Sequence, residues 1–109
     1  MVLLDVRLPF PFEDGSFDYV FSEHSIEHVS YQHGLRCLQE CFRVLRPGGK
    51  IRLSTPNLAF VLQLYSDPKS DFQKRYISWS AETFLADIAS PDDAFVINNF
   101  FRDWNHQFI

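Results

Sequence analysis

Three side chains capable of acid–base chemistry stand close together near the amino end of the chain. His24, Glu27 and His28 follow a short apolar run. Histidine titrates near neutral pH and a carboxylate can orient its ring, so these residues are candidates for positioning a substrate or removing a proton from a nucleophile. The alternative is local hydrogen bonding, because His24 and His28 lie four residues apart on one helix face. No third ligand follows at a metal-binding spacing, so the sequence predicts no metal site.

Strands and one helix must hold these residues in place. Val2–Asp5, Phe17–Ser22 and Lys50–Thr55 are predicted as strands, because they are short runs rich in apolar or alternating side chains. Ser30 is a favourable helix N-cap, and apolar residues then recur at helical spacing up to the glycines at 48 and 49, which are expected to end the helix in a left-handed cap. That stripe consists of Leu35, Leu38, Phe42 and Leu45.

The order strand, loop, strand, helix, strand predicts an α/β fold whose sheet is mostly parallel with helical crossovers. Ligands of such sheets bind beyond the carboxyl ends of the strands. In this chain those ends are residues 5–6, 22–24 and 54–56, and we expect them to face one crevice.

The part of the chain after Pro56 is predicted to differ in secondary structure from the part before it. Residues 1–56 are expected to hold the sheet and its crossover helix, and residues 57–109 a helical, aromatic segment of the same domain. A short helix is predicted over 58–65 and another within 98–104. The spacing between Phe72 and Ile88 is compatible with one bent helix or with two, the second capped by Ser80.

Composition narrows the class of protein. The chain has 109 residues with a net charge of −4, which argues against a nucleic-acid ligand on electrostatic grounds. No apolar run approaches the ~20 residues that span a bilayer, so no membrane association is expected. Cys37 and Cys41 have the spacing of two thiols on one helix face, which suits a reducing, cytoplasmic location.

Three segments, taken together, resemble the class I S-adenosylmethionine-dependent methyltransferases. They are Asp5-Val6 before LPF, the run DGSFDYV at 14–20 leading to Glu27-His28, and LRPGGK at 45–50 before a strand. The last residues, NNFFRDWNHQFI at 98–109, further resemble a group of predicted bacterial methyltransferases. The resemblance implies a Rossmann-like sheet and methyl transfer from S-adenosylmethionine to an unknown acceptor.

The resemblance also implies a role for several residues. Asp5 would accept a hydrogen bond from the adenine amino group, and the Val6 N–H would meet a ring nitrogen. Ser22 and Glu23 would lie beside the methionine part of the cofactor, with His24 or His28 near the acceptor. Considered without the family, Asp5 is better explained as a residue that caps the following turn, and the family pattern around it reverses that preference.

The family has a glycine-rich turn that approaches the cofactor and an acidic residue that binds the ribose hydroxyls, and neither is found in these residues. The four glycines, at 15, 34, 48 and 49, form no Gly-x-Gly, and no acid for the ribose hydroxyls is identified. We therefore expect the amino-terminal βαβ portion of the sheet to be missing and the Phe17–Ser22 strand to have an unpaired edge. Two hypotheses follow: a methyltransferase whose missing cofactor lobe comes from a partner chain, and a non-catalytic homodimer or partner-binding remnant of the fold.

Overall fold

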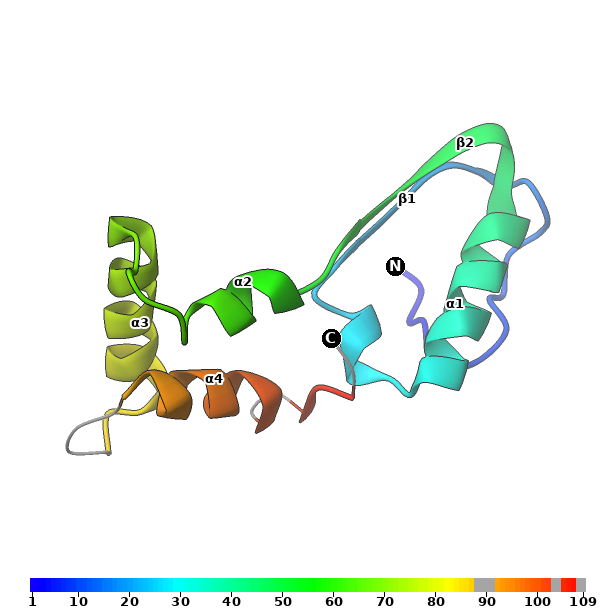
Figure 1. Ribbon diagram of the computed structural model, residues 1–109. Helices are drawn as coiled ribbons and strands as arrows, with labels where there is room; N and C mark the ends of the chain where they lie inside the picture. The colour runs from blue at the N-terminus through cyan, green and yellow to red at the C-terminus, as the bar shows by residue number, and fades with distance from the viewer. Residues whose placement is uncertain (88–91, 103–104, 108–109) are drawn as a thin grey trace. The chain divides into compact units, whose positions relative to one another are not determined.

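The computed structural model describes residues 1–87, 92–102 and 105–107, which fall into two compact units. The first unit is Met1–Pro56 together with His106 and Gln107, and the second is built from Asn57 onward to Asn105 (Figure 1).

The first unit is a β–α–β arrangement. Strand β1 (Phe17–Glu23) leads through the short 3-10 helix η1 (Ile26–His28) into helix α1 (Tyr31–Val44), and strand β2 (Leu45–Ser54) returns beside β1. The strands are parallel (Figure 1), with Val20 opposite Ile51 and Ser22 opposite Leu53. The predicted α/β class, with parallel strands joined by a helical crossover, is confirmed, and the described residues contain this one two-stranded sheet.

Helix α1 begins where its sequence signal places it. The Ser30 side chain accepts a hydrogen bond from the His33 backbone N–H at 3.3 Å, which satisfies one of the free donors of the first turn. The face toward the core carries Cys37, Cys41 and Val44. The apolar stripe that indicated the helix lies largely on its exposed side: Leu35, Leu38 and Phe42 are exposed.

A network around Arg43 fixes the loop before β1 against α1. The guanidinium donates to the carbonyl oxygens of Phe10 (3.0 Å) and Phe12 (2.8 Å), and it forms ion pairs of 2.7 Å with Glu40 and Asp14. Glu40 in turn accepts a 2.7 Å hydrogen bond from the Phe10 N–H. This arrangement holds Phe10 and Phe12 over the small core of the unit, which also contains Val20, Cys37, Cys41 and Val44.

The predicted strand Val2–Asp5 is wrong, because these residues adopt no regular structure. A strand is stable only when a neighbouring strand takes up its backbone hydrogen bonds. The residues of the described chain supply no such neighbour, since β1 pairs with β2.

The end of α1 also differs from the prediction. The helix ends at Val44, and Leu45 is already extended, so no glycine acts as its left-handed cap. The glycines instead lie inside β2, where Gly48 has a φ of +82° and the register against β1 shifts between Phe17 and Tyr19. Gly48 thus allows an irregularity in the strand that a side chain would strain.

The second unit is helical. It contains α2 (Leu58–Gln63), α3 (Asp71–Phe84) and α4 (Asp93–Arg102) around a core of Leu64, Leu85 and Val96. Helix α3 is a single helix that starts with a capping box between Ser70 and Gln73, whereas Ser80 is buried inside it and caps nothing. Helix α4 begins five residues before the predicted 98, and Ile88 and Trp104, which the predicted helices included, lie outside the described residues.

No helix among the described residues is both long and apolar enough to cross a membrane. Cys37 and Cys41 are free thiols, the second of them buried, as their spacing on α1 predicted.

Replacing Gly49 by alanine is expected to destabilise the chain by about 1–3 kcal/mol, the usual cost of overpacking. A Cβ at this position would lie 2.9 Å from the Arg46 carbonyl oxygen and 3.2 Å from that of Asp18, and neither backbone atom can rotate away. Urea unfolding measures the effect, with the exposed neighbour variant Lys50→Ala as the matched control. Equal unfolding midpoints for the two variants would contradict the tight contact.

Glu40→Gln is expected to lower stability at neutral pH but not in strong acid. Hydrogen bonds from Arg43 and from the Phe10 N–H lower the pKa of Glu40 from its ordinary value of 4.5 to about 2. Because the folded pKa is depressed, the stabilisation is present above pH 4.5 and is lost as the pH falls toward 2. Urea unfolding of both proteins between pH 7 and 2 should show the difference shrinking through this window.

The effect should also depend on Arg43. In an Arg43→Gln background, Glu40→Gln should produce a much smaller pH-dependent change, because the principal donor to the carboxylate is gone. A stability difference that stays constant with pH would show that the Glu40 network does not stabilise the fold.

Candidate functional site

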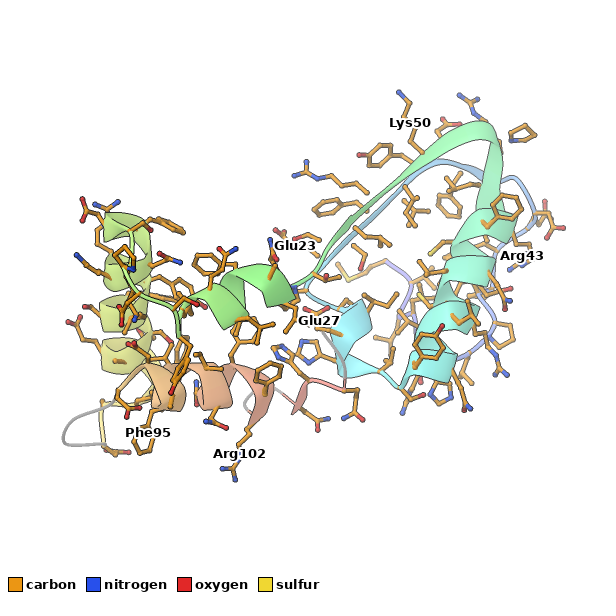
Figure 2. All side chains as sticks on the ribbon, viewed as in Figure 1. Glu23, Glu27, Arg43, Lys50, Phe95 and Arg102 are labelled. Atoms are coloured by element: carbon orange, nitrogen blue, oxygen red, sulfur yellow. The ribbon has the colours of Figure 1, made fainter. Side chains whose placement is uncertain are left out.

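The carboxyl ends of the two strands lie side by side. Glu23, the last residue of β1, is opposite Ser54, the last residue of β2, and the His24 N–H donates to the Ser54 carbonyl oxygen at 2.9 Å. Figure 2 labels Glu23 and Glu27 at this edge of the sheet. The predicted meeting of residues 22–24 with residues 54–56 is therefore found.

His24 turns the chain out of the sheet. Its φ of +46° lies in the left-handed region, which is uncommon for a residue with a side chain and directs the backbone into η1. Through this turn its Nδ1 atom lies 3.2 Å from Oε1 of Glu27. The carboxylate is thus close enough to hold the histidine ring by a hydrogen bond.

Glu27 is the most unusual residue of this edge. Its side chain is only 1% exposed, and its second oxygen, Oε2, is buried with no hydrogen-bond partner among the described residues. Burying a carboxylate without partners is costly, and such groups are rare in folded proteins unless a ligand or ion completes them.

His106 joins this group from the far end of the chain. Its ring centroid lies 4.9 Å from that of His28, and the N–H of the next residue, Gln107, donates to the Glu27 carbonyl oxygen at 2.7 Å. One donor atom from each of Glu27, His28 and His106 lies within 4.8 Å of the other two. We call Glu27, His28 and His106, with His24 beside them, the strand-end cluster.

Sequence reasoning identified three members of the strand-end cluster and missed His106. No local spacing connects it with His28, because the two residues are brought together only by the fold. The available signal was its residue type, since it is one of the four histidines of the chain.

Asp5 and Val6 line a separate hollow of about 590 Å³. Ser25, which directly follows the turn at His24, lines the same hollow. Both oxygens of Asp5 contact the Arg7 side chain, at 2.7 and 2.9 Å, and this partner lowers the pKa of Asp5 to about 2. Ser22 and Glu23 do not line this hollow.

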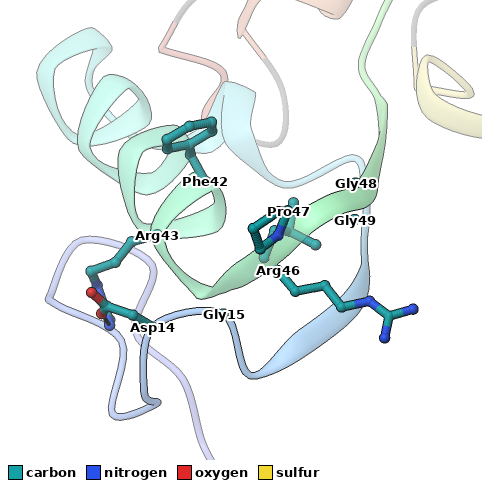
Figure 3. A pocket seen from close by; sticks show the side chains of 9 residues that line it. Asp14, Gly15, Phe42, Arg43, Arg46, Pro47, Gly48 and Gly49 are labelled. Atoms are coloured by element: carbon teal, nitrogen blue, oxygen red, sulfur yellow. Dashed lines mark hydrogen bonds and ion pairs between the residues drawn. The ribbon is translucent and has the colours of Figure 1, made fainter.

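A second hollow lies at the opposite, amino-terminal end of the strands (Figure 3). Pro47, Gly48 and Gly49 line it together with Arg43 and Arg46. Both arginines are neutralised, Arg43 by Asp14 at 2.7 Å and Arg46 by Asp18 at 2.6 Å. This hollow therefore offers no net positive charge to a phosphate.

Comparison with known proteins agrees with the geometry. Residues 1–53 match the sequence profile of a family described as a methyltransferase domain. Over 83 residues the chain is 37% identical to a probable S-adenosylmethionine-dependent methyltransferase of Mycolicibacterium smegmatis. The aligned region covers 76% of this chain and 31% of that protein. Over 88 residues it is 40% identical to phosphoethanolamine N-methyltransferase 2 of Caenorhabditis elegans, covering 76% of this chain and 18% of that protein.

The chain thus spans about a third of the first relative's length and less than a fifth of the second's. No solved structure matches it significantly. The family match covers β1, the crossover helix, nearly all of β2 and the strand-end residues 22–28, and both relatives are named as methyltransferases. Residues 1–53 therefore belong to a methyltransferase domain family, and the chain resembles S-adenosylmethionine-dependent methyltransferases.

Proposed function

We propose that this chain forms the adenine-side wall of an S-adenosylmethionine site and takes part in methyl transfer to an acceptor beside the strand-end cluster. The observation that supports this most directly is the hollow lined by Asp5, Val6 and Ser25, which lies within the family-matched residues. Its position after the carboxyl end of β1 is the usual location for a ligand in a parallel α/β sheet.

The Asp5 carboxylate has an unused acceptor position that could receive a hydrogen bond from an adenine amino group. Oδ1 accepts from the Arg7 backbone N–H and from its Nε, while Oδ2 accepts only from Nη2. A carboxylate has about four acceptor positions, so Oδ2 retains one for a further donor. Because the pKa of Asp5 is about 2, the carboxylate is an acceptor throughout the neutral range.

S-adenosylmethionine supplies an activated methyl group, so the protein's main task is to align the acceptor. In this proposal Ser22 and Glu23 lie toward the methionine side, and His24, held by Glu27, helps position the acceptor with His28 near it. The ion pair between His24 and Glu27, at 3.2 Å, gives that ring a fixed orientation.

The glycine-rich turn and the ribose-binding acid of the family would come from polypeptide outside these 109 residues. The glycines at 15, 48 and 49 belong to turns or to β2, and Gly34 is buried in α1. We therefore propose that the complete site forms with a further segment or a partner chain. The free thiols of Cys37 and Cys41 are compatible with a cytoplasmic setting for this activity.

S-adenosylhomocysteine should perturb the backbone amide resonances of Asp5, Val6 and Ser25 saturably in NMR titrations of the full chain. Asp5→Asn should weaken this binding about tenfold or more, since a hydrogen bond to a charged acceptor is stronger than one to a neutral acceptor. The matched control is Asp71→Asn, which changes an exposed carboxylate of α3 in the other unit.

Two outcomes would reject the proposal. One is the absence of any perturbation at millimolar ligand. The other is perturbation that Asp5→Asn and Asp71→Asn affect equally, because the carboxylate of Asp5 would then have no part in binding.

A specific observation also favours the non-catalytic alternative, in which the first unit is a dimerising or partner-binding module. The aromatic side chains of β1 and the stripe on α1 are open to solvent, with Phe21 55% and Phe42 84% exposed. The other edge of β1 is unpaired among the described residues. An open strand edge beside exposed apolar side chains is a surface that proteins normally cover.

Sedimentation equilibrium at high micromolar concentration should reveal a dimer if this surface pairs with a second copy. Phe21→Lys combined with Phe42→Lys should shift the protein toward monomer, because each change replaces an exposed aromatic side chain by a charge. Tyr65→Lys, at an exposed aromatic residue of the second unit, serves as control. A strict monomer at high micromolar concentration would exclude self-association.

A further inference from the structure

The strand-end cluster contains a buried carboxylate whose second oxygen has no partner in the described chain. Glu27 is 1% exposed, and its Oε2 has no hydrogen-bond partner. Its Oε1 has one neighbour, Nδ1 of His24 at 3.2 Å. A carboxylate in this position favours a further partner at Oε2, because its solvation is lost and only part of its acceptor capacity is used.

The surroundings of Glu27 favour a cation. His28 and His106 each place a ring nitrogen so that the two nitrogens and a Glu27 oxygen lie within 4.8 Å of one another. Zinc binds imidazole nitrogen and carboxylate oxygen at about 2.0–2.2 Å, so the ligands of a tetrahedral site lie roughly 3.3–3.6 Å apart. Small rotations of the three side chains would bring the donors to that separation.

We propose that Glu27, His28 and His106 bind a zinc ion and leave its fourth position open. Two imidazoles and one carboxylate form a donor set suited to zinc and other transition metals. Calcium and magnesium are disfavoured because they require mostly oxygen ligands. The proposed zinc site does not require S-adenosylmethionine, because all three of its protein ligands come from this chain.

Contacts around these ligands support the assignment. His24 engages Oε1 of Glu27, which leaves Oε2 for the metal, and ligating carboxylates commonly have such an outer partner. The 2.7 Å hydrogen bond from the Gln107 N–H to the Glu27 carbonyl oxygen ties the segment that carries His106 to η1. The third ligand is thus positioned by the backbone as well as by its own side chain.

The test is titration of the metal-stripped full chain with Zn²⁺ by calorimetry and with Co²⁺ by visible absorption. We expect one site per chain with micromolar or tighter affinity and the intense d–d bands of tetrahedral cobalt. Glu27→Gln and His106→Gln should each weaken binding by at least tenfold. His33→Gln is the matched control, because His33 is the histidine of the chain that lies outside the strand-end cluster.

Two further measurements distinguish this site from metal binding by thiolates and from loss of folding. Cys37→Ala combined with Cys41→Ala should leave the affinity unchanged, and the cobalt spectrum should lack a thiolate charge-transfer band. Without metal, Glu27→Gln should be as stable as the parent chain or more stable, since a buried amide with an unused acceptor costs less than a buried carboxylate with one. Measuring the stability of the metal-free Glu27→Gln variant therefore shows whether it folds, separately from whether it binds zinc.

Three results would overturn the proposal: no zinc binding at high micromolar metal, equal affinity in Glu27→Gln, His106→Gln and His33→Gln, or loss of binding in the cysteine variant. The last two would locate the metal elsewhere. A chain that binds zinc but not S-adenosylhomocysteine would support the metal site and reject the proposed function, and the opposite pattern would do the reverse.

Discussion

The parallel pairing of β1 with β2 is the constraint on which the first unit depends. Two parallel strands cannot be joined by a tight turn, so the chain must return to its starting end through a crossover, here α1. The crossover places Glu23 and Ser54 at one edge of the sheet. The turn at His24 begins at that edge, and the buried Glu27 follows within the next helical turn. The position of the strand-end cluster thus follows from the parallel topology.

The pairing is stabilised by contacts at the other end of the strands. Arg43 links α1 to the loop that precedes β1, while Arg46 on β2 pairs with Asp18 on β1. These charges are used within the fold, which is why the glycine-containing hollow beside them is a poor anion site. The amino-terminal end of the strands is therefore rich in paired charges. At their carboxyl end, the buried carboxylate of Glu27 has an incomplete set of partners.

The sequence predicted what depends on local patterns. Ser30 and the apolar repeat after it located α1, and the alternation around Ile51 located β2. Long-range features were predicted less well. Residues Val2–Asp5 are of types that favour a strand, but no neighbouring strand is present among the described residues. Gly48 is of the type that commonly ends helices, but it lies in an irregular part of β2. His106 joins Glu27 and His28 only through the fold. Residue types alone also could not show that Leu35, Leu38 and Phe42 face solvent while Cys37 and Cys41 face the core.

The central claim is that β1, α1 and β2 bring the strand ends together and assemble the strand-end cluster without a cofactor. Nuclear Overhauser spectroscopy of the isolated chain tests it most directly. The structure predicts interstrand contacts between Val20 and Ile51 and between Ser22 and Leu53, together with contacts between the ring protons of His28 and His106. Strands without these contacts, or a His106 ring with no contact to His28, would contradict this claim.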